Sequence, residues 1–187
     1  MAYKAILVGT GTWGEWWCEK FLPPNIADGT VEVVAAVDRN PAALGCAKKF
    51  LHLSDAQCYT DAETAFRENK ADFCINVVTP AHHEEIVDLA IKYGLNILSE
   101  KPIADTLEGS IRIAEKVKKA GLKMGVTMSH RFDQDKTSMR GQLRSGRWGE
   151  LDYIITRFTC DCRKYGSWGE FRHDIANTLL LEGAVHH

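Results

Sequence analysis

The sequence predicts an α/β protein with a doubly wound parallel sheet, and two observations support this fold class. First, short apolar runs bounded by turn residues alternate with segments of helical periodicity through the first two thirds of the chain. Second, the runs are continuously apolar, as in strands that are buried on both faces of a sheet. Because strand–helix–strand connections are right-handed, helices should cover both faces of that sheet.

The predicted strands are the apolar runs that end in a turn residue. In chain order they cover residues 3–8, 31–38, 72–80, 96–102 and 123–129. The carboxyl ends of parallel strands lie along one edge of a sheet, so the residues that follow them should face a common crevice.

Helices are predicted between these strands from capping residues and apolar periodicity. The first covers residues 14–22 and ends at Pro23 and Pro24. The second starts at Pro41, after the N-cap Asn40, and runs to about Phe50. Proline suits the first position of a helix because its missing N–H would have no partner there.

Three further helices are predicted in the same way. A capping box of Thr60 with Glu63 starts one, and residues 84–93 form the next, with Gly94 as C-cap. Asp105 and Glu108 cap the last, which ends at Gly121. Its predicted apolar face consists of Leu107, Ile111, Ala114 and Val117.

The character of the sequence changes after the fifth strand, so we predict two domains, over residues 1–126 and 127–187. Residues 151–162 alternate like a half-exposed strand, and residues 179–187 have a helical pattern. Cys160 and Cys162 would share one face of that strand, but no second ligand pair accompanies them, so no metal site is predicted.

Composition and charge argue against two classes of protein, those that bind nucleic acid and those that span a membrane. The chain has 187 residues, a net charge of −2 and no basic block, which argues against a nucleic-acid surface. No apolar stretch is long enough to span a membrane. The six cysteines are interpreted as reduced thiols, which favours a cytoplasmic protein.

The first strand leads into the sequence GTGTWG, with glycines at positions 9, 11 and 14. A dinucleotide-binding turn needs Gly9 for the turn, Gly11 for close approach of a pyrophosphate and Gly14 for helix packing. Thr12 and Trp13 would flank the cofactor at the helix N-terminus, where backbone amides bind phosphate. The alternatives are an ordinary strand-to-helix corner and the glycine turn of a methyltransferase.

An acidic residue after the second strand strengthens the dinucleotide interpretation. The Asp38 carboxylate would accept hydrogen bonds from the adenosine ribose and repel a 2′-phosphate, which favours NAD. Arg39 is adjacent and could pair with such a phosphate, so NADP is kept as the alternative cofactor.

The next two strand ends supply further candidates. Thr79 and Pro80 should lie near the cofactor, with His83 at the start of the following helix. Glu100 and Lys101 follow the next strand beside the same crevice. A partly buried lysine is costly unless it has a partner or a chemical role, and proton transfer would be such a role.

Near the end of the chain, Glu182 and His186 are four residues apart and would share one face of a helix. A carboxylate beside an imidazole orients the ring and supports its use as a general base. The alternative is a surface pair without a catalytic role.

Six segments together resemble the Gfo/Idh/MocA oxidoreductase family, and they occur in the family's order along nearly the whole chain. They are ILVGTGTWG, VDRNP, VTPAHHEEI, SEKPIADT, SHRF and LLLEGAVHH. The resemblance implies a Rossmann domain followed by an α/β domain with an open, mostly antiparallel sheet, of which this chain has only the start. It also implies an NAD(P)-dependent dehydrogenase acting on a sugar-like or polyol substrate, and a homo-oligomer.

The resemblance also assigns roles to individual residues. Lys101 of the EKP sequence would be the catalytic lysine, and His186 would be the catalytic histidine. Glu182 stands where many family members have aspartate. In the implied mechanism His186, assisted by Lys101, removes a hydroxyl proton while the hydride passes to nicotinamide. The competing hypothesis is a sensor that binds NAD(P) without turnover.

Overall fold

A computed structural model describes residues 1–155 and 157. The chain divides into two compact units, Met1–Val126 and Thr127–His187. Each unit is described separately.

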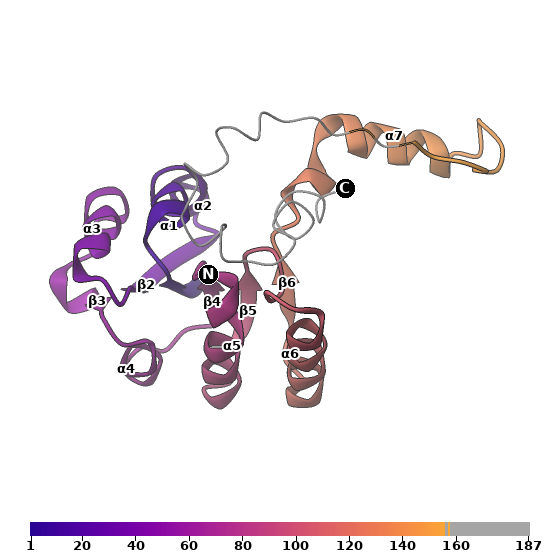
Figure 1. The fold of residues 1–187 in the computed structure, drawn as a ribbon. Coiled ribbons are helices and arrows are strands. Elements are labelled where there is room, and N and C mark those ends of the chain that lie inside the picture. Colours follow the sequence, from indigo (N-terminus) through magenta and orange to yellow (C-terminus); the bar gives the residue numbers. More distant parts are fainter. Residues whose placement is uncertain (156, 158–187) are drawn as a thin grey trace. The chain divides into compact units, whose positions relative to one another are not determined.

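The first unit is a six-stranded parallel sheet covered by helices (Figure 1). Its strands are β1 Tyr3–Val8, β2 Val31–Val37, β3 Cys58–Tyr59, β4 Phe73–Asn76, β5 Asn96–Ser99 and β6 Met124–Val126. The spatial order is β3-β2-β1-β4-β5-β6, and every pair of neighbours is parallel. The chain builds outward from β1 to one edge and then returns to build the other half, so β1 and β4 flank the switch point of a Rossmann-like sheet.

The helices lie on both faces of the sheet, as the sequence predicts. They are α1 Thr12–Trp16, α2 Leu22–Ala27, α3 Gly45–Leu51, α4 Ala62–Glu68, α5 His83–Lys92 and α6 Leu107–Ala120. A π-helical segment, Trp17–Phe21, joins α1 to α2. Figure 1 shows α1, α2 and α3 on one side of the sheet and α4, α5 and α6 on the other.

Two apolar cores form because alternate residues of a strand point to opposite faces. In β1, Ala5 and Leu7 pack on one face, while Ile6 and Val8 pack on the other. The α1–α3 side contributes Trp17, Cys18, Leu22, Leu44 and Ala47 to its core. The α4–α6 side contributes Phe66, Ile86, Val87, Ile113 and Val117.

The first helix differs from the prediction at both ends. It starts at Thr12, and helical geometry continues past Pro23 and Pro24 to Ala27. Proline inside an α-helix normally clashes with the preceding turn and removes a hydrogen bond. Here the π-helical segment ends just before the prolines and places them in the first turn of α2, where proline is tolerated.

Two predicted helix caps are wrong by one residue. Asp61, not Thr60, caps α4, because its side chain accepts a hydrogen bond from the Thr64 amide at 2.8 Å. Thr106, not Asp105, caps α6 and accepts from the Gly109 amide at 3.1 Å. In both cases two adjacent residues are good N-cap types, and the local sequence does not distinguish them.

The predicted inner face of α6 is also wrong in part. Leu107, Ile111 and Ala114 are exposed, so Val117 alone of the predicted face is buried. Ile113, which was not predicted, is buried beside it. The short edge strand β3 was not predicted, because it has only two residues and pairs with β2 alone. Three strands are shorter than predicted: within the segments 72–80, 96–102 and 123–129, only the residues of β4, β5 and β6 form strands. Thr79, Glu100 and Lys101 therefore lie outside the strands.

In the second unit, the described residues form a 3-10 turn, Ser129–Phe132, followed by α7, Gln134–Arg144. The Asp133 carboxylate binds the His130 ring and the Lys136 ammonium, each at 2.8 Å. Residues 151–155 form no strand, contrary to the first part of the prediction for 151–162. Three predictions concern residues outside those that the structure describes. They are the rest of the strand, over 158–162, the helix over 179–187 and the antiparallel sheet.

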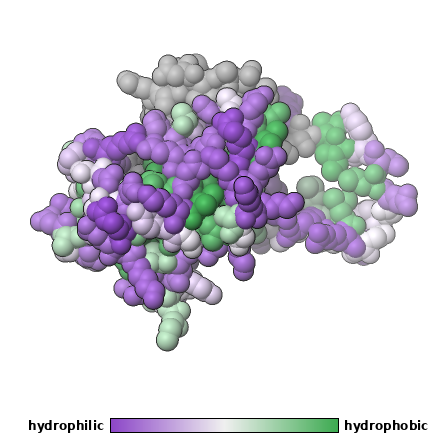
Figure 2. Space-filling view, turned by 90° about the horizontal axis from the view of Figure 1, so that it is seen from below, coloured by the Kyte–Doolittle hydropathy of each residue, from purple (hydrophilic) through white to green (hydrophobic). Residues whose placement is uncertain are grey.

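Most of the face visible in Figure 2 is hydrophilic, and hydrophobic residues show in several places, among them near the centre of the view. Among the described residues, no helix has the length and apolar character needed to cross a membrane.

Candidate functional site

The glycine turn lies at the switch point of the sheet. Gly9 directly follows β1, and its amide donates to the Val37 carbonyl of β2 at 2.8 Å. Its φ of +94° is a conformation that only glycine adopts readily. A Cβ at Gly9 would lie 2.7 Å from the carbonyl carbon of Val77, in the loop after β4. The loops after β1 and β4 are therefore in direct contact.

Gly14 and Gly11 are required for different reasons. A Cβ at Gly14 would lie 2.3 Å from the Gly9 carbonyl oxygen, so glycine lets the first helix pack onto the turn. A Cβ at Gly11 would meet no atom within 4 Å, and no side chain caps α1 at this N-cap. Internal packing thus explains Gly9 and Gly14, while the open backbone at Gly11 fits close approach of a pyrophosphate.

Asp38 follows β2 and is fixed beside this turn. Its Oδ2 accepts hydrogen bonds from the Thr10 amide at 2.8 Å and the Thr10 hydroxyl at 3.4 Å, and its Oδ1 accepts from the Asn40 amide at 2.9 Å. A carboxylate has about four acceptor sites, so it retains capacity for ribose hydroxyls. Thr10, which is buried, was not predicted as part of the site, although it lies between two of the glycines.

Thr12 and Trp13 are exposed at the start of α1. Trp13 also belongs to an aromatic cluster, with ring centroids 6.1 Å from Trp16 and 6.0 Å from Phe21. Trp16 is half exposed, whereas Trp17 is buried.

The Arg39 side chain pairs with a carboxylate of α5. Its Nη2 donates to the two carboxylate oxygens of Glu85 at 2.5 and 2.7 Å. Both side chains are largely exposed, at 68% for Arg39 and 50% for Glu85. Glu85 was not predicted as part of the site, because 46 residues separate it from Arg39.

The loop after β4 carries Thr79 and Pro80. Thr79 is half-buried, and its hydroxyl lies 2.9 Å from Nδ1 of His82. Pro80 is buried and opens the 3-10 turn that leads into α5. The loop after β4 lies at the same sheet edge as the glycine turn, because the backbone of Gly9 packs closely against the backbone of Val77 in this loop.

His83 is fully buried, and both of its ring nitrogens face backbone carbonyls. Nε2 lies 3.0 Å from the Val78 oxygen and Nδ1 lies 3.2 Å from the Ile103 oxygen. Burial lowers the pKa of the imidazole. The buried ring connects the loops after β4 and β5 through these two carbonyls. A cofactor contact of His83 stays a prediction.

The loop after β5 is anchored by the buried carboxylate of Glu100. Its Oε1 accepts a hydrogen bond from the Trp17 indole N–H at 2.8 Å, and its Oε2 accepts from the Lys101 amide at 3.2 Å. The Glu100 amide donates to the Asn76 carbonyl at 2.8 Å. These contacts fix the loop in which half-buried Lys101 follows Glu100. No local signal in the sequence marks the bond of Trp17 to a residue 83 positions away.

Two further polar atoms lie at this edge. The Oδ1 of Asn76 and the Oγ of Ser99 are buried without a hydrogen-bond partner among the described residues. Asn76 and Ser99 are register partners at the ends of β4 and β5. Such groups suit an ordered water or a ligand, since buried polar atoms are normally paired. Glu182 and His186 lie outside the described residues.

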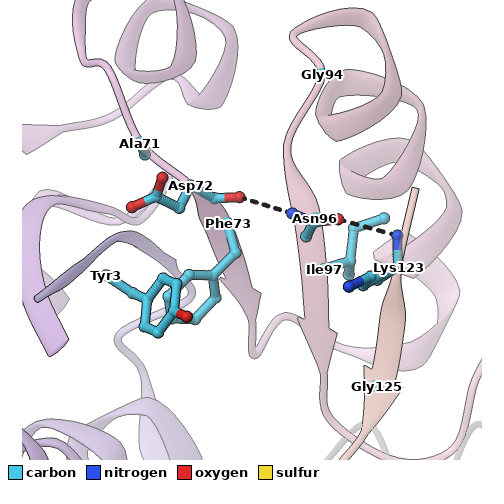
Figure 3. A pocket seen from close by; sticks show the side chains of 9 residues that line it. All are labelled: Tyr3, Ala71, Asp72, Phe73, Gly94, Asn96, Ile97, Lys123 and Gly125. Carbon is cyan, nitrogen blue, oxygen red and sulfur yellow. Dashed lines mark hydrogen bonds between the residues drawn. The ribbon is translucent and has the colours of Figure 1, made fainter. Parts of the chain in front are cut away.

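A shallow depression of about 580 Å³ lies at the opposite, amino edge of the sheet (Figure 3). Tyr3, Phe73, Asn96 and Lys123 are among its lining residues. Asn96 is held there by the Asp72 carbonyl, and its Oδ1 accepts from the Lys123 amide at 3.0 Å. Ligands of such sheets bind at the carboxyl edge, so this depression is not part of the candidate site.

The strand order, the glycine turn and the acidic residue after β2 define a dinucleotide-binding domain. The family model of the oxidoreductases with an NAD-binding Rossmann fold, Gfo/Idh/MocA, matches residues 3–128. The chain therefore belongs to this family, and its cofactor is NAD.

Two relatives and one solved structure illustrate the similarity. The chain is 54% identical to the uncharacterized protein y4oX of Sinorhizobium fredii, over all of this chain and 52% of that protein. It is 31% identical to an inositol 2-dehydrogenase/D-chiro-inositol 3-dehydrogenase of Lacticaseibacillus casei, over 78% of this chain and 41% of that protein. The fold matches a scyllo-inositol dehydrogenase of Lactobacillus casei, solved with NAD(H) and scyllo-inositol, with a TM-score of 0.79. That match has 22% identity and covers 100% of this chain and 54% of the other. The chain thus spans about half the length of these relatives.

Proposed function

We propose that the chain is the nucleotide-binding part of an NAD-dependent dehydrogenase that oxidises a hydroxyl group of a polyol or sugar-like substrate. The observation that carries this proposal is the position of Lys101. It follows Glu100, the first residue after β5, at the carboxyl edge of the sheet, in a loop anchored by that buried carboxylate and at the same edge as the glycine turn. The relatives that are named inositol dehydrogenases support the substrate class.

The chain's own groups then have distinct tasks. The amides around Gly11 bind the pyrophosphate and Asp38 binds the adenosine ribose, with Thr12 and Trp13 beside the cofactor. Thr79 and Pro80 border the nicotinamide end of the crevice. Bound NAD supplies the hydride acceptor.

Proton transfer falls to the remaining polar residues. Lys101 donates a hydrogen bond to the reacting hydroxyl oxygen, and His186 accepts the hydroxyl proton as general base. Glu182 orients the His186 ring. The fold places the ends of β1, β4 and β5 along one edge, which is what such an arrangement requires.

A polyol screen with NAD, following the appearance of reduced nicotinamide, tests the proposal. Lys101→Ala should lower turnover by about a hundredfold or more while NADH affinity stays the same, because a proton-transfer group contributes on that order. Lys118→Ala is the matched control, since Lys118 is exposed on α6. Unchanged turnover in Lys101→Ala contradicts the catalytic assignment.

The sensor hypothesis makes a different prediction. It requires saturable NADH binding with no turnover of any polyol, whereas a methyltransferase would bind S-adenosylmethionine and no nicotinamide. Lys101 favours the enzyme, because a sensor has no need of a lysine at the crevice. A cytoplasmic location, a homo-oligomer and the absence of nucleic-acid binding stay predictions of the sequence analysis.

A further inference from the structure

The end of β2 presents two opposite charges that face different partners. Asp38 is locked onto the glycine turn by the Thr10 and Asn40 amides. The next residue, Arg39, is held by Glu85 of α5 through two contacts, at 2.5 and 2.7 Å. Glu85 therefore reaches from the second half of the sheet to a side chain at the adenosine end of the candidate site.

This contact bears on the choice between NAD and NADP. The two cofactors differ by the 2′-phosphate on the adenosine ribose, which needs a cation near the end of β2. Arg39 is the cation that directly follows Asp38, and a guanidinium fork suits phosphate well. The Glu85 carboxylate accepts from that guanidinium and offsets its positive charge.

We propose that Glu85 is a specificity-determining residue, which keeps the site selective for NAD by holding Arg39 away from a 2′-phosphate. The inference rests on the proposed function, because it requires a dinucleotide in the crevice. It goes beyond Asp38, which repels the phosphate directly, by adding a residue that withholds the compensating cation.

The neighbouring carboxylate shows that this role belongs to Glu85 alone within the first turn of α5. Glu84 faces α6, where Arg112 donates to it at 2.8 Å and Lys116 at 2.9 Å. Those two cations, Arg112 first, lower the pKa of Glu84 to about 2. The two glutamates are adjacent and carry the same charge, so Glu84 provides a matched control for Glu85.

The test is a titration of the purified chain with NADH and NADPH, following energy transfer from tryptophan to the reduced nicotinamide. Glu85→Gln should raise the affinity for NADPH relative to NADH by about threefold, the scale of an exposed ion pair. Glu84→Gln should leave the ratio of the two affinities at the parental value. The gain should shrink in high salt, because both side chains are exposed.

A double variant identifies Arg39 as the responsible cation. Arg39→Ala combined with Glu85→Gln should abolish the gain in NADPH affinity, since no guanidinium is left to release. The inference is overturned if the gain in NADPH affinity persists in the double variant, or if Glu85→Gln leaves the ratio of the two affinities unchanged. In both cases the binding of NADH would still support the nucleotide site. A parental chain that binds neither nucleotide overturns the proposed function itself.

Discussion

The glycine turn after β1 and the loop after β5 lie at the same edge of one sheet, but they are held in different ways. The glycine turn is shaped by backbone atoms in close contact, as between Gly14 and the Gly9 carbonyl. The loop after β5 is held by side chains from distant elements, through the Trp17–Glu100 bond and the ring of His83. The nucleotide-binding part is thus a backbone structure, and the part that carries Lys101 depends on long-range hydrogen bonds.

This difference determines which amino-acid substitutions destabilise each loop. In the glycine turn an added methyl group meets backbone, which has little room to move. In the loop after β5 the loss of one donor leaves a buried acceptor unpaired. The following predictions test the comparison in order of decreasing effect.

Gly14→Ala should have the largest effect. Its Cβ would lie 2.3 Å from the Gly9 oxygen, so the helix and the turn must separate, at a cost of about 3 kcal/mol or more in the free energy of unfolding. Urea unfolding measures that loss. Gly45→Ala is the control, because a Cβ there, in α3, meets nothing within 4 Å. Equal stability of the two variants would contradict a backbone-determined turn.

Trp17→Phe should come next, with a loss of about 2 kcal/mol. The variant keeps an aromatic ring but leaves the buried Oε1 of Glu100 without its donor, and hydrogen bonds to charged groups contribute on this order. Trp16→Phe is the control, because Trp16 is half exposed, and it should change stability by less than about 0.5 kcal/mol. Similar unfolding curves for both variants would show that the Trp17–Glu100 bond does not stabilise the loop.

Gly11→Ala should separate binding from folding. No atom lies within 4 Å of the added Cβ, so the unfolding midpoint should stay close to the parental value. NADH affinity should fall by about tenfold, equivalent to about 1.4 kcal/mol, because the methyl group meets the pyrophosphate. Gly141→Ala in α7 is the control for both measurements. Retained NADH affinity in Gly11→Ala would place the pyrophosphate elsewhere.

The smallest effect concerns pH and His83. Burial lowers the pKa of His83 below its ordinary value of 6.5, so the unfolded chain binds more protons just below that pH. The free energy of unfolding should therefore decrease as the pH falls from about 6.5 toward the folded-state pKa. Replacing the ring by glutamine, in His83→Gln, should reduce this dependence by less than about 1.4 kcal/mol per pH unit.

Urea unfolding on both sides of pH 6.5 measures this dependence, with exposed His52→Asn as the control. The His52 variant should follow the parental curve, since asparagine also tolerates the left-handed backbone found there. A parental pH dependence in His83→Gln would show that other groups cause it.

The same comparison explains which features were predictable. Gly9 and Gly14 belong to one turn, whose spacing of a few residues is visible in the sequence. Asp38 was predicted because it directly follows an apolar run, although its contact with Thr10 spans 28 residues. The parallel sheet follows from the apolar runs. Helix caps were misplaced by one residue, as at Asp61, because neighbouring residues offer the same chemistry. Trp17 and Glu85 obtain their roles from partners 83 and 46 residues away, and one of the two partners of His83 is 20 residues away. No local pattern shows these distant contacts.

The π-helical segment Trp17–Phe21 has a consequence for how the length of this chain can vary. A π turn closes between residues five apart and an α turn between residues four apart, so the two differ by one residue. Deleting exposed Lys20 would convert the turn to α geometry while Trp17 and Leu22 keep their faces toward the sheet. In evolutionary terms, the first helix contains a position where a one-residue deletion changes a single turn instead of rotating a whole buried face.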